Sequence, residues 1–100
     1  MELAKGNVRQ AAEKTWGAVA LSIKAYAYWR ESRRIVTHGD LWEYKDRVAE
    51  DLGDWVGSVF RQASGLHTCF YGGWCTRKDV ESVLLEARKL IEEIAKRVLT

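Results

Sequence analysis

The chain has 100 residues, of which 30% are charged and 47% hydrophobic, and its formal net charge is only +2. This balance is typical of a globular domain and excludes a disordered chain. No stretch approaches the roughly 18 apolar residues that a membrane-spanning helix needs, and charged residues interrupt the N-terminal segment where a signal peptide has its apolar core. We therefore expect one cytoplasmic domain over residues 1–100, with no membrane segment.

The first predicted element is a long helix. Apolar residues recur along one stripe at spacings of three and four, and this stripe consists of Ala12, Trp16, Val19, Ile23 and Tyr26. The stripe predicts a helix from about Val8 to Ser32, with Asn7 as its N-cap. A second stripe of small residues repeats every seven positions (Ala11, Ala18 and Ala25), and small residues allow another helix to approach closely.

The next two helices are predicted from turn and cap residues. Asp40 is the expected N-cap of a second helix that extends to Leu52. The turn at Gly53 leads to Asp54, the expected cap of a third helix, and Gly72-Gly73 ends that helix.

A last helix is predicted after Thr76, because Asp79 three residues later completes the pattern of a capping box. Its apolar residues follow one face as far as Val98. The absence of proline agrees with long helices and few turns. The fold class is therefore all-α, an up-and-down bundle of three to four main helices.

Neither a cofactor nor a metal is expected. The chain has no glycine loop followed by Lys-Ser or Lys-Thr, which would bind a nucleotide phosphate. Its two histidines and two cysteines do not form a zinc-binding pattern. Cys69 and Cys75 are either free thiols or a disulfide, and the sequence does not decide between them.

The segment 60–73 contains the two residues whose side chains are best suited to catalysis, Arg61 and His67. Histidine can accept the proton of a ribose 2′-hydroxyl or protonate a leaving oxygen, because its pKa lies near neutrality. Arginine can stabilise the charge that develops on the phosphorus. This pair is suited to RNA cleavage without a metal.

A regular helix would place these two side chains roughly 120° apart, since each residue turns the helix by about 100°. A kink at Gly65 or a second subunit would be needed to bring both to one phosphate. The alternative interpretation is that His67 packs in the core or an interface and that Arg61 is a solvated surface residue.

Two segments resemble a known family. GNVRQAAEKTWGAVALSIKAYA, residues 6–27, looks like the opening helix of the archaeal PaREP family of small helical proteins from hyperthermophiles. ASGLHTCFYGG, residues 63–73, resembles its Leu-His-x-x-Phe-Tyr signature. A composition poor in Asn, Gln and Met and rich in charged residues is typical of a hot-growing source.

That family in turn resembles the HEPN superfamily of helical bundles, many of which are metal-independent ribonucleases or toxins with an Arg-x(4–6)-His motif. The resemblance implies Arg61 and His67 as a catalytic pair and Tyr71 as a phosphate or base contact. It also implies a homodimer that acts on RNA as a ribonuclease, toxin or defence component. The alternative is a non-catalytic module that binds RNA, a nucleotide or a partner protein of the nucleotidyltransferase type. Gln62 departs from the Asn, Asp or His that active members often have next to the arginine.

The five tryptophans are many for one small core. We expect Trp29, Trp42, Trp55 and Trp74 to fill the core or a subunit interface, where large aromatic side chains contribute the most burial. Stacking on RNA bases is the alternative.

Overall fold

The computed structural model describes residues 5–72 and 76–99, and within these ranges the side chains of residues 5–8, 67 and 69–72 are outside the description. Four helices follow one another along the chain: α1 (Lys5–Glu31), α2 (His38–Leu52), α3 (Trp55–Gly72) and α4 (Arg77–Val98). No strand occurs in the described ranges. The predicted all-α bundle is confirmed.

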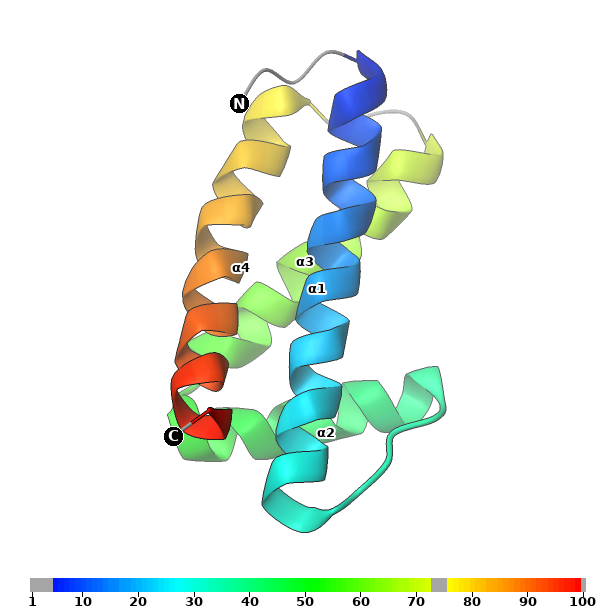
Figure 1. Cartoon of the computed structure of the whole chain (residues 1–100). Helices are drawn as coiled ribbons and strands as arrows, with labels where there is room; N and C mark the ends of the chain where they lie inside the picture. The colour runs from blue at the N-terminus through cyan, green and yellow to red at the C-terminus, as the bar shows by residue number, and fades with distance from the viewer. Residues whose placement is uncertain (1–4, 73–75, 100) are drawn as a thin grey trace.

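Three of the helices lie along the length of the molecule (Figure 1). α1 and α4 run side by side in the same direction, and α3 passes diagonally behind them in the opposite direction. α2 lies across the end at which α1 and α4 finish. The described part measures 40 × 26 × 20 Å, and the 27 residues of α1 span about 40 Å at ~1.5 Å per residue. α1 is therefore the longest helix and extends along the whole bundle.

The main core forms where all four helices meet. Its largest fully buried side chains include Tyr26, Tyr44, Phe60 and Leu90, one from each helix. Removal of this apolar surface from water is the main favourable contribution to folding. Among the described residues, no helix is long and apolar enough to cross a bilayer.

The tryptophans divide between the core and the surface. Trp16 and Trp42 are half-buried and pack against the core, whereas Trp29 and Trp55 are 48% and 37% exposed. Trp74, for which the same role was predicted, lies outside the described residues. The surplus of aromatic residues is therefore partly on the surface.

Two predicted N-caps were wrong. α1 begins at Lys5, so Asn7 lies inside the helix. At α2 the cap is Thr37, whose extended backbone lets its hydroxyl accept a hydrogen bond from the backbone N–H of Asp40 at 3.0 Å. Asp40 lies in the first turn, where its negative charge interacts favourably with the helix dipole.

The predicted capping box of α4 is confirmed. The hydroxyl of Thr76 accepts from the N–H of Asp79 at 3.1 Å, and the carboxylate of Asp79 accepts from the N–H of Thr76 at 3.2 Å. These two bonds satisfy backbone donors that the helix itself leaves free. They also lower the pKa of the Asp79 carboxyl below its ordinary value.

Candidate functional site

Arg61 and His67 both lie on α3, which continues from Trp55 to Gly72 without a break at Gly65. Positions six residues apart on a regular helix point roughly 120° away from each other. Arg61 is exposed. The side chains of His67 and Tyr71, the other two predicted site residues, are outside the described residues. The backbone of α3 thus supplies no kink that would direct Arg61 and His67 to one point within a chain.

The outer face of α3 carries a row of polar groups around Arg61. The exposed residues of this face are Ser58, Arg61, Gln62, Gly65 and Thr68. The amide nitrogen of Gln62 donates to the hydroxyl of Ser58 at 3.1 Å. A Cβ built on Gly65 would meet no atom within 4 Å, so the surface there is open. We call these five residues the α3 polar row.

The α3 polar row has no negative charge. There is no Asp or Glu in the sequence between Asp54 and Asp79, and α3 is the only one of the four helices that lacks one. Arg61 forms no ion pair with any residue that the structure describes. Its guanidinium lies over the backbone of Gly57, 3.1 Å from where a Cβ would stand. This face offers a cation, among hydrogen-bonding groups, that no carboxylate in the described ranges neutralises.

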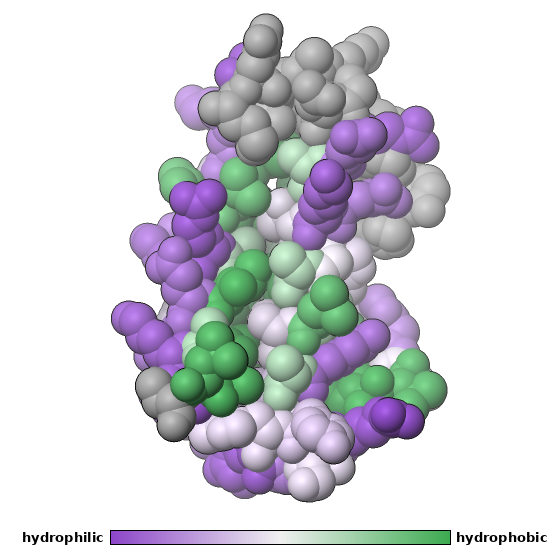
Figure 2. Space-filling model, in the orientation of Figure 1, coloured by the Kyte–Doolittle hydropathy of each residue, from purple (hydrophilic) through white to green (hydrophobic). Residues whose placement is uncertain are grey.

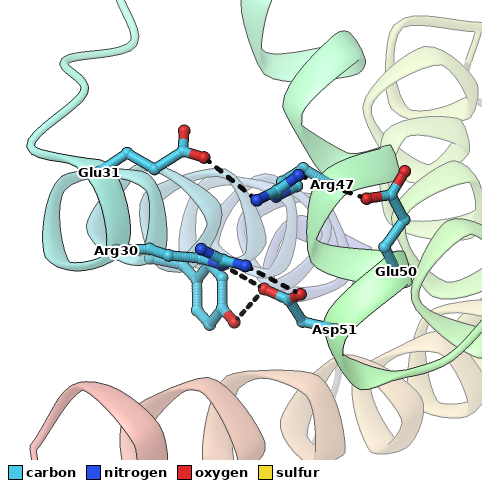
Figure 3. Close-up of polar contacts among 6 residues, drawn as sticks. Arg30, Glu31, Arg47, Glu50 and Asp51 are labelled. Atoms are coloured by element: carbon cyan, nitrogen blue, oxygen red, sulfur yellow. Dashed lines mark hydrogen bonds and ion pairs between the residues drawn. The ribbon is translucent and has the colours of Figure 1, made fainter.

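Where α1 ends beside α2, by contrast, an arginine is paired with a carboxylate. The guanidinium of Arg30 donates to both carboxylate oxygens of Asp51 (Figure 3). The hydroxyl of the buried Tyr26 donates to the same carboxylate at 2.7 Å. These hydrogen bonds, from Arg30 first and then Tyr26, lower the pKa of Asp51 to about 2. The bond to Asp51 raises the pKa of Arg30 further, and burial raises that of Tyr26.

A second set of charges lies beside this one. Arg47 contacts Glu31 of α1 at 3.6 Å and Glu50 of α2 at 3.5 Å (Figure 3). Together with Tyr44 these residues line an open cleft of about 340 Å³, whose other lining residues are Arg33, Glu43 and Asp46. Burial, and then the nearby Glu31, raise the pKa of the Tyr44 hydroxyl.

This cleft is a poor site for an anion. Four carboxylates and only two guanidinium groups line it, and Arg47 is already between two carboxylates. A phosphate there would meet a net negative surface, and binding would require an existing ion pair to break. The network instead ties α1 to α2.

A third group of interest is aromatic and lies where α2 meets α1 and α3. The indole N–H of Trp42 donates to Nε2 of His38 at 2.9 Å. The ring of Trp42 packs edge-on against Phe60, with centroids 4.9 Å apart, and Lys45 lies near both rings. These contacts occupy Trp42 in packing and leave it little freedom to stack on a base.

A family model described as the archaeal PaREP1/PaREP8 family matches residues 1–91. The chain belongs to this family. The match covers α1, α2, α3 and most of α4, so the PaREP1/PaREP8 assignment applies to nearly the whole bundle. A search of curated proteins and a search of solved structures gave no match.

The sequence motifs did not indicate that the neighbours of Arg61 on the α3 polar row belong to a candidate site. Ser58, Gln62 and Thr68 are residue types that occur on any helix surface, so none attracts attention alone. The signal that could have found them is the run without Asp or Glu between Asp54 and Asp79. In a chain in which 30% of residues are charged, such a run on the surface of one helix marks a different environment.

Proposed function

We propose that this PaREP1/PaREP8 protein is RNA-associated, and that the α3 polar row binds the phosphodiester backbone through Arg61. The observation that carries the proposal is the exposed guanidinium of Arg61, which no carboxylate among the described residues neutralises. Arginine and phosphate form charge-assisted hydrogen bonds of matching geometry. The cation is therefore available without the loss of an existing ion pair.

The neighbours of Arg61 fit the same ligand. Hydroxyl and amide groups, such as those of Ser58, Gln62 and Thr68, are common partners of phosphate and sugar oxygens. Gly65 leaves a gap in the row where a sugar–phosphate backbone can approach the helix closely. The 2′-hydroxyl of RNA adds a donor and acceptor that such a row can engage.

The catalytic form of the proposal is a HEPN-like, metal-independent endoribonuclease in which Arg61 and His67 act on one phosphate. His67 would take the proton of the 2′-hydroxyl, and Arg61 would stabilise the charge on the phosphorus. A role as a toxin or defence component would follow from that activity. The separation of about 120° along an unbroken α3 means that this form needs a residue from a second α3.

The non-catalytic form is favoured by that same separation. In it the α3 polar row holds RNA or a nucleotide, His67 packs against neighbouring side chains, and Tyr71 has no catalytic role. A nucleotidyltransferase-type protein is the partner that the HEPN resemblance suggests for this form. Of the two forms, the geometry supports the binding module better.

Binding is tested with Arg61→Ala against Arg34→Ala, measured by fluorescence anisotropy on labelled single-stranded RNA and DNA over a range of salt. Arg34 is also exposed and lies in the segment before α2. We expect Arg61→Ala to weaken binding and to reduce the salt-dependence slope by about 0.7–1. Equal losses in both variants would show that only net charge matters and would refute a site on α3.

Cleavage is tested separately on end-labelled RNA in EDTA with the native chain, His67→Ala and Arg61→Ala. Products with 2′,3′-cyclic phosphate ends that disappear in both variants would establish the ribonuclease form. Binding that depends on Arg61 without cleavage above the variants' background would establish the non-catalytic form.

A further inference from the structure

Gly57 lies in the first turn of α3, four positions before Arg61. Residues four positions apart are neighbours on one face of a helix, and helical side chains lean toward the N-terminus. Arg61 therefore leans over Gly57. The three atoms nearest to a Cβ built on Gly57 all belong to the guanidinium group of Arg61, with Nη1 at 3.1 Å and both Cζ and Nη2 at 3.7 Å. The guanidinium group thus occupies space that a side chain at position 57 would need.

The backbone at position 57 does not itself require glycine. α3 is helical there, and Gly53 is the one glycine with a positive φ among the described residues. Glycine is less favourable than alanine inside a helix, because it loses more conformational freedom on folding. Atoms beyond these three lie 3.7 Å or more from the Cβ position, which is ordinary van der Waals contact. Room for the guanidinium group is therefore what glycine provides at this position.

A second tie of the same spacing lies next to this one. Ser58 and Gln62 each follow Gly57 and Arg61 by one position, and the amide nitrogen of Gln62 donates to the hydroxyl of Ser58 at 3.1 Å. The two ties hold an amide and a guanidinium group beside each other along the α3 polar row. A side chain that is already ordered loses less entropy when a ligand binds.

We propose that Gly57 is a positioning residue of the α3 polar row, which holds the guanidinium group of Arg61 against the helix, where it meets an RNA phosphate. This inference rests on the proposed function, because it takes a phosphate of RNA as the ligand of Arg61. Gly57 acts through Arg61 and supplies no group to the ligand. Arginine has a long side chain with many rotamers, so its order before binding contributes directly to affinity.

The two glycines of the middle of α3 have different roles in this arrangement. A Cβ on Gly65 would meet no atom within 4 Å, whereas a Cβ on Gly57 would press on Nη1 of Arg61. Alanine at Gly65 fills a gap that RNA would use, and alanine at Gly57 displaces the cation. The effect of Gly57→Ala on RNA binding should consequently depend on the presence of Arg61.

The control position is Gly17 on α1, where a Cβ would meet no atom within 4 Å. α1 and α4 form the side of the molecule that Figure 2 shows, on which a band of apolar and weakly polar side chains has hydrophilic side chains on its flanks. α3 lies behind these two helices (Figure 1). Gly17→Ala therefore makes the same substitution on a helix that carries no residue of the α3 polar row.

The inference is tested by fluorescence anisotropy on labelled single-stranded RNA with the native chain, Gly57→Ala, Arg61→Ala, the double variant and Gly17→Ala. We expect Gly57→Ala to raise the dissociation constant about two- to tenfold and Gly17→Ala to leave it unchanged. In the Arg61→Ala background, Gly57→Ala should cause no further loss. A native affinity in Gly57→Ala beside a weakened Arg61→Ala, or a loss from Gly57→Ala that persists without Arg61, would overturn the inference and leave the proposed function standing.

A second measurement needs no RNA. The order parameter of the Arg61 Nε–H group, from nitrogen-15 relaxation, should fall in Gly57→Ala and stay at the native value in Gly17→Ala. An order parameter that Gly57→Ala leaves unchanged would also overturn the inference. Native RNA affinity in Arg61→Ala would instead refute the proposed function, whatever the order parameter shows. Alanine is the better helix former, so thermal unfolding should show that Gly57→Ala remains as stable as the native chain, and lost RNA affinity then reports on Arg61 alone.

Discussion

Two regions of the molecule differ in whether their arginines are paired with carboxylates. These regions are the end of the bundle where α1 meets α2 and the outer face of α3. Arg30 and Arg47 each contact carboxylates of neighbouring elements, while Arg61 has no ion pair among the described residues. An arginine that is already neutralised contributes to the fold and has little left for a ligand. The comparison teaches that the position of the carboxylates, more than that of the arginines, separates a structural region from a candidate binding surface.

The largest effect is expected at the turn that joins the two regions. Gly53 has φ 127° and ψ 159°, and a Cβ there would lie 2.8 Å from the ring of Trp55. Gly53→Ala should lower the free energy of unfolding by about 2–3 kcal/mol, because this backbone region is nearly restricted to glycine. Chemical denaturation measures it. Gly39→Ala is the control, because a Cβ there meets no atom within 4 Å. If Gly53→Ala lowered the free energy of unfolding by less than this control, the inferred backbone strain at Gly53 would be contradicted.

The Arg30–Asp51 contact should stabilise the fold, whereas Arg61 should contribute little to the free energy of unfolding. Asp51→Ala leaves the buried hydroxyl of Tyr26 without its acceptor, and we expect a loss of about 2 kcal/mol in the free energy of unfolding. Arg61→Ala should change stability by less than about 0.5 kcal/mol. Glu81→Ala, which removes an exposed partner of Arg77, controls for an ordinary surface pair. If Arg61→Ala proves as destabilising as Asp51→Ala, the contrast between the two regions fails.

Acid should weaken the α1–α2 end selectively. The pKa of Asp51 is about 2 in the folded chain and 3.8 in its ordinary state, so its stabilisation is present above pH 4 and is lost as the pH falls through about 2. Thermal unfolding followed from pH 5 to pH 2 should show this loss. Asp51→Asn should flatten the curve and leave a smaller slope from Asp79, whose pKa is also lowered. An unchanged curve in Asp51→Asn would assign the acid sensitivity to other carboxylates.

The smallest expected effect on stability comes from two glycines inside helices, and one of them also tests whether RNA approaches α3. Gly65 and Gly17 both lie inside helices, and a Cβ on either would meet no atom within 4 Å. Alanine at each should stabilise the chain by about 0.5–1 kcal/mol, since glycine is a weak helix former. Only Gly65→Ala should also weaken RNA binding, because it fills the gap in the α3 polar row. Equal RNA affinity in the two variants would mean that RNA does not approach α3 at this point.

The capping motif at the start of α4 was predicted correctly, because the interaction that forms it is local. The capping box of Thr76 and Asp79 spans three residues, and the sequence contains all of its parts. The sequence predicted Asp40 as the N-cap of α2, whereas the cap in the structure is Thr37, three positions earlier. Residue preference alone does not separate them, because both types are favoured N-caps. The backbone conformation that the chain takes on leaving α1 decides between them.

Four helices, their apolar faces and the pair Arg61–His67 on one of them follow from the sequence alone, because periodicity and helical geometry depend on neighbours a few positions away. Tertiary structure alone decided that Asp51 is the carboxylate that holds Arg30 and Tyr26, which lie 21 and 25 positions before it. It also left Arg61 without a carboxylate partner among the described residues. Contacts between distant positions depend on how the helices pack, and packing sums many weak interactions that no short stretch of sequence contains.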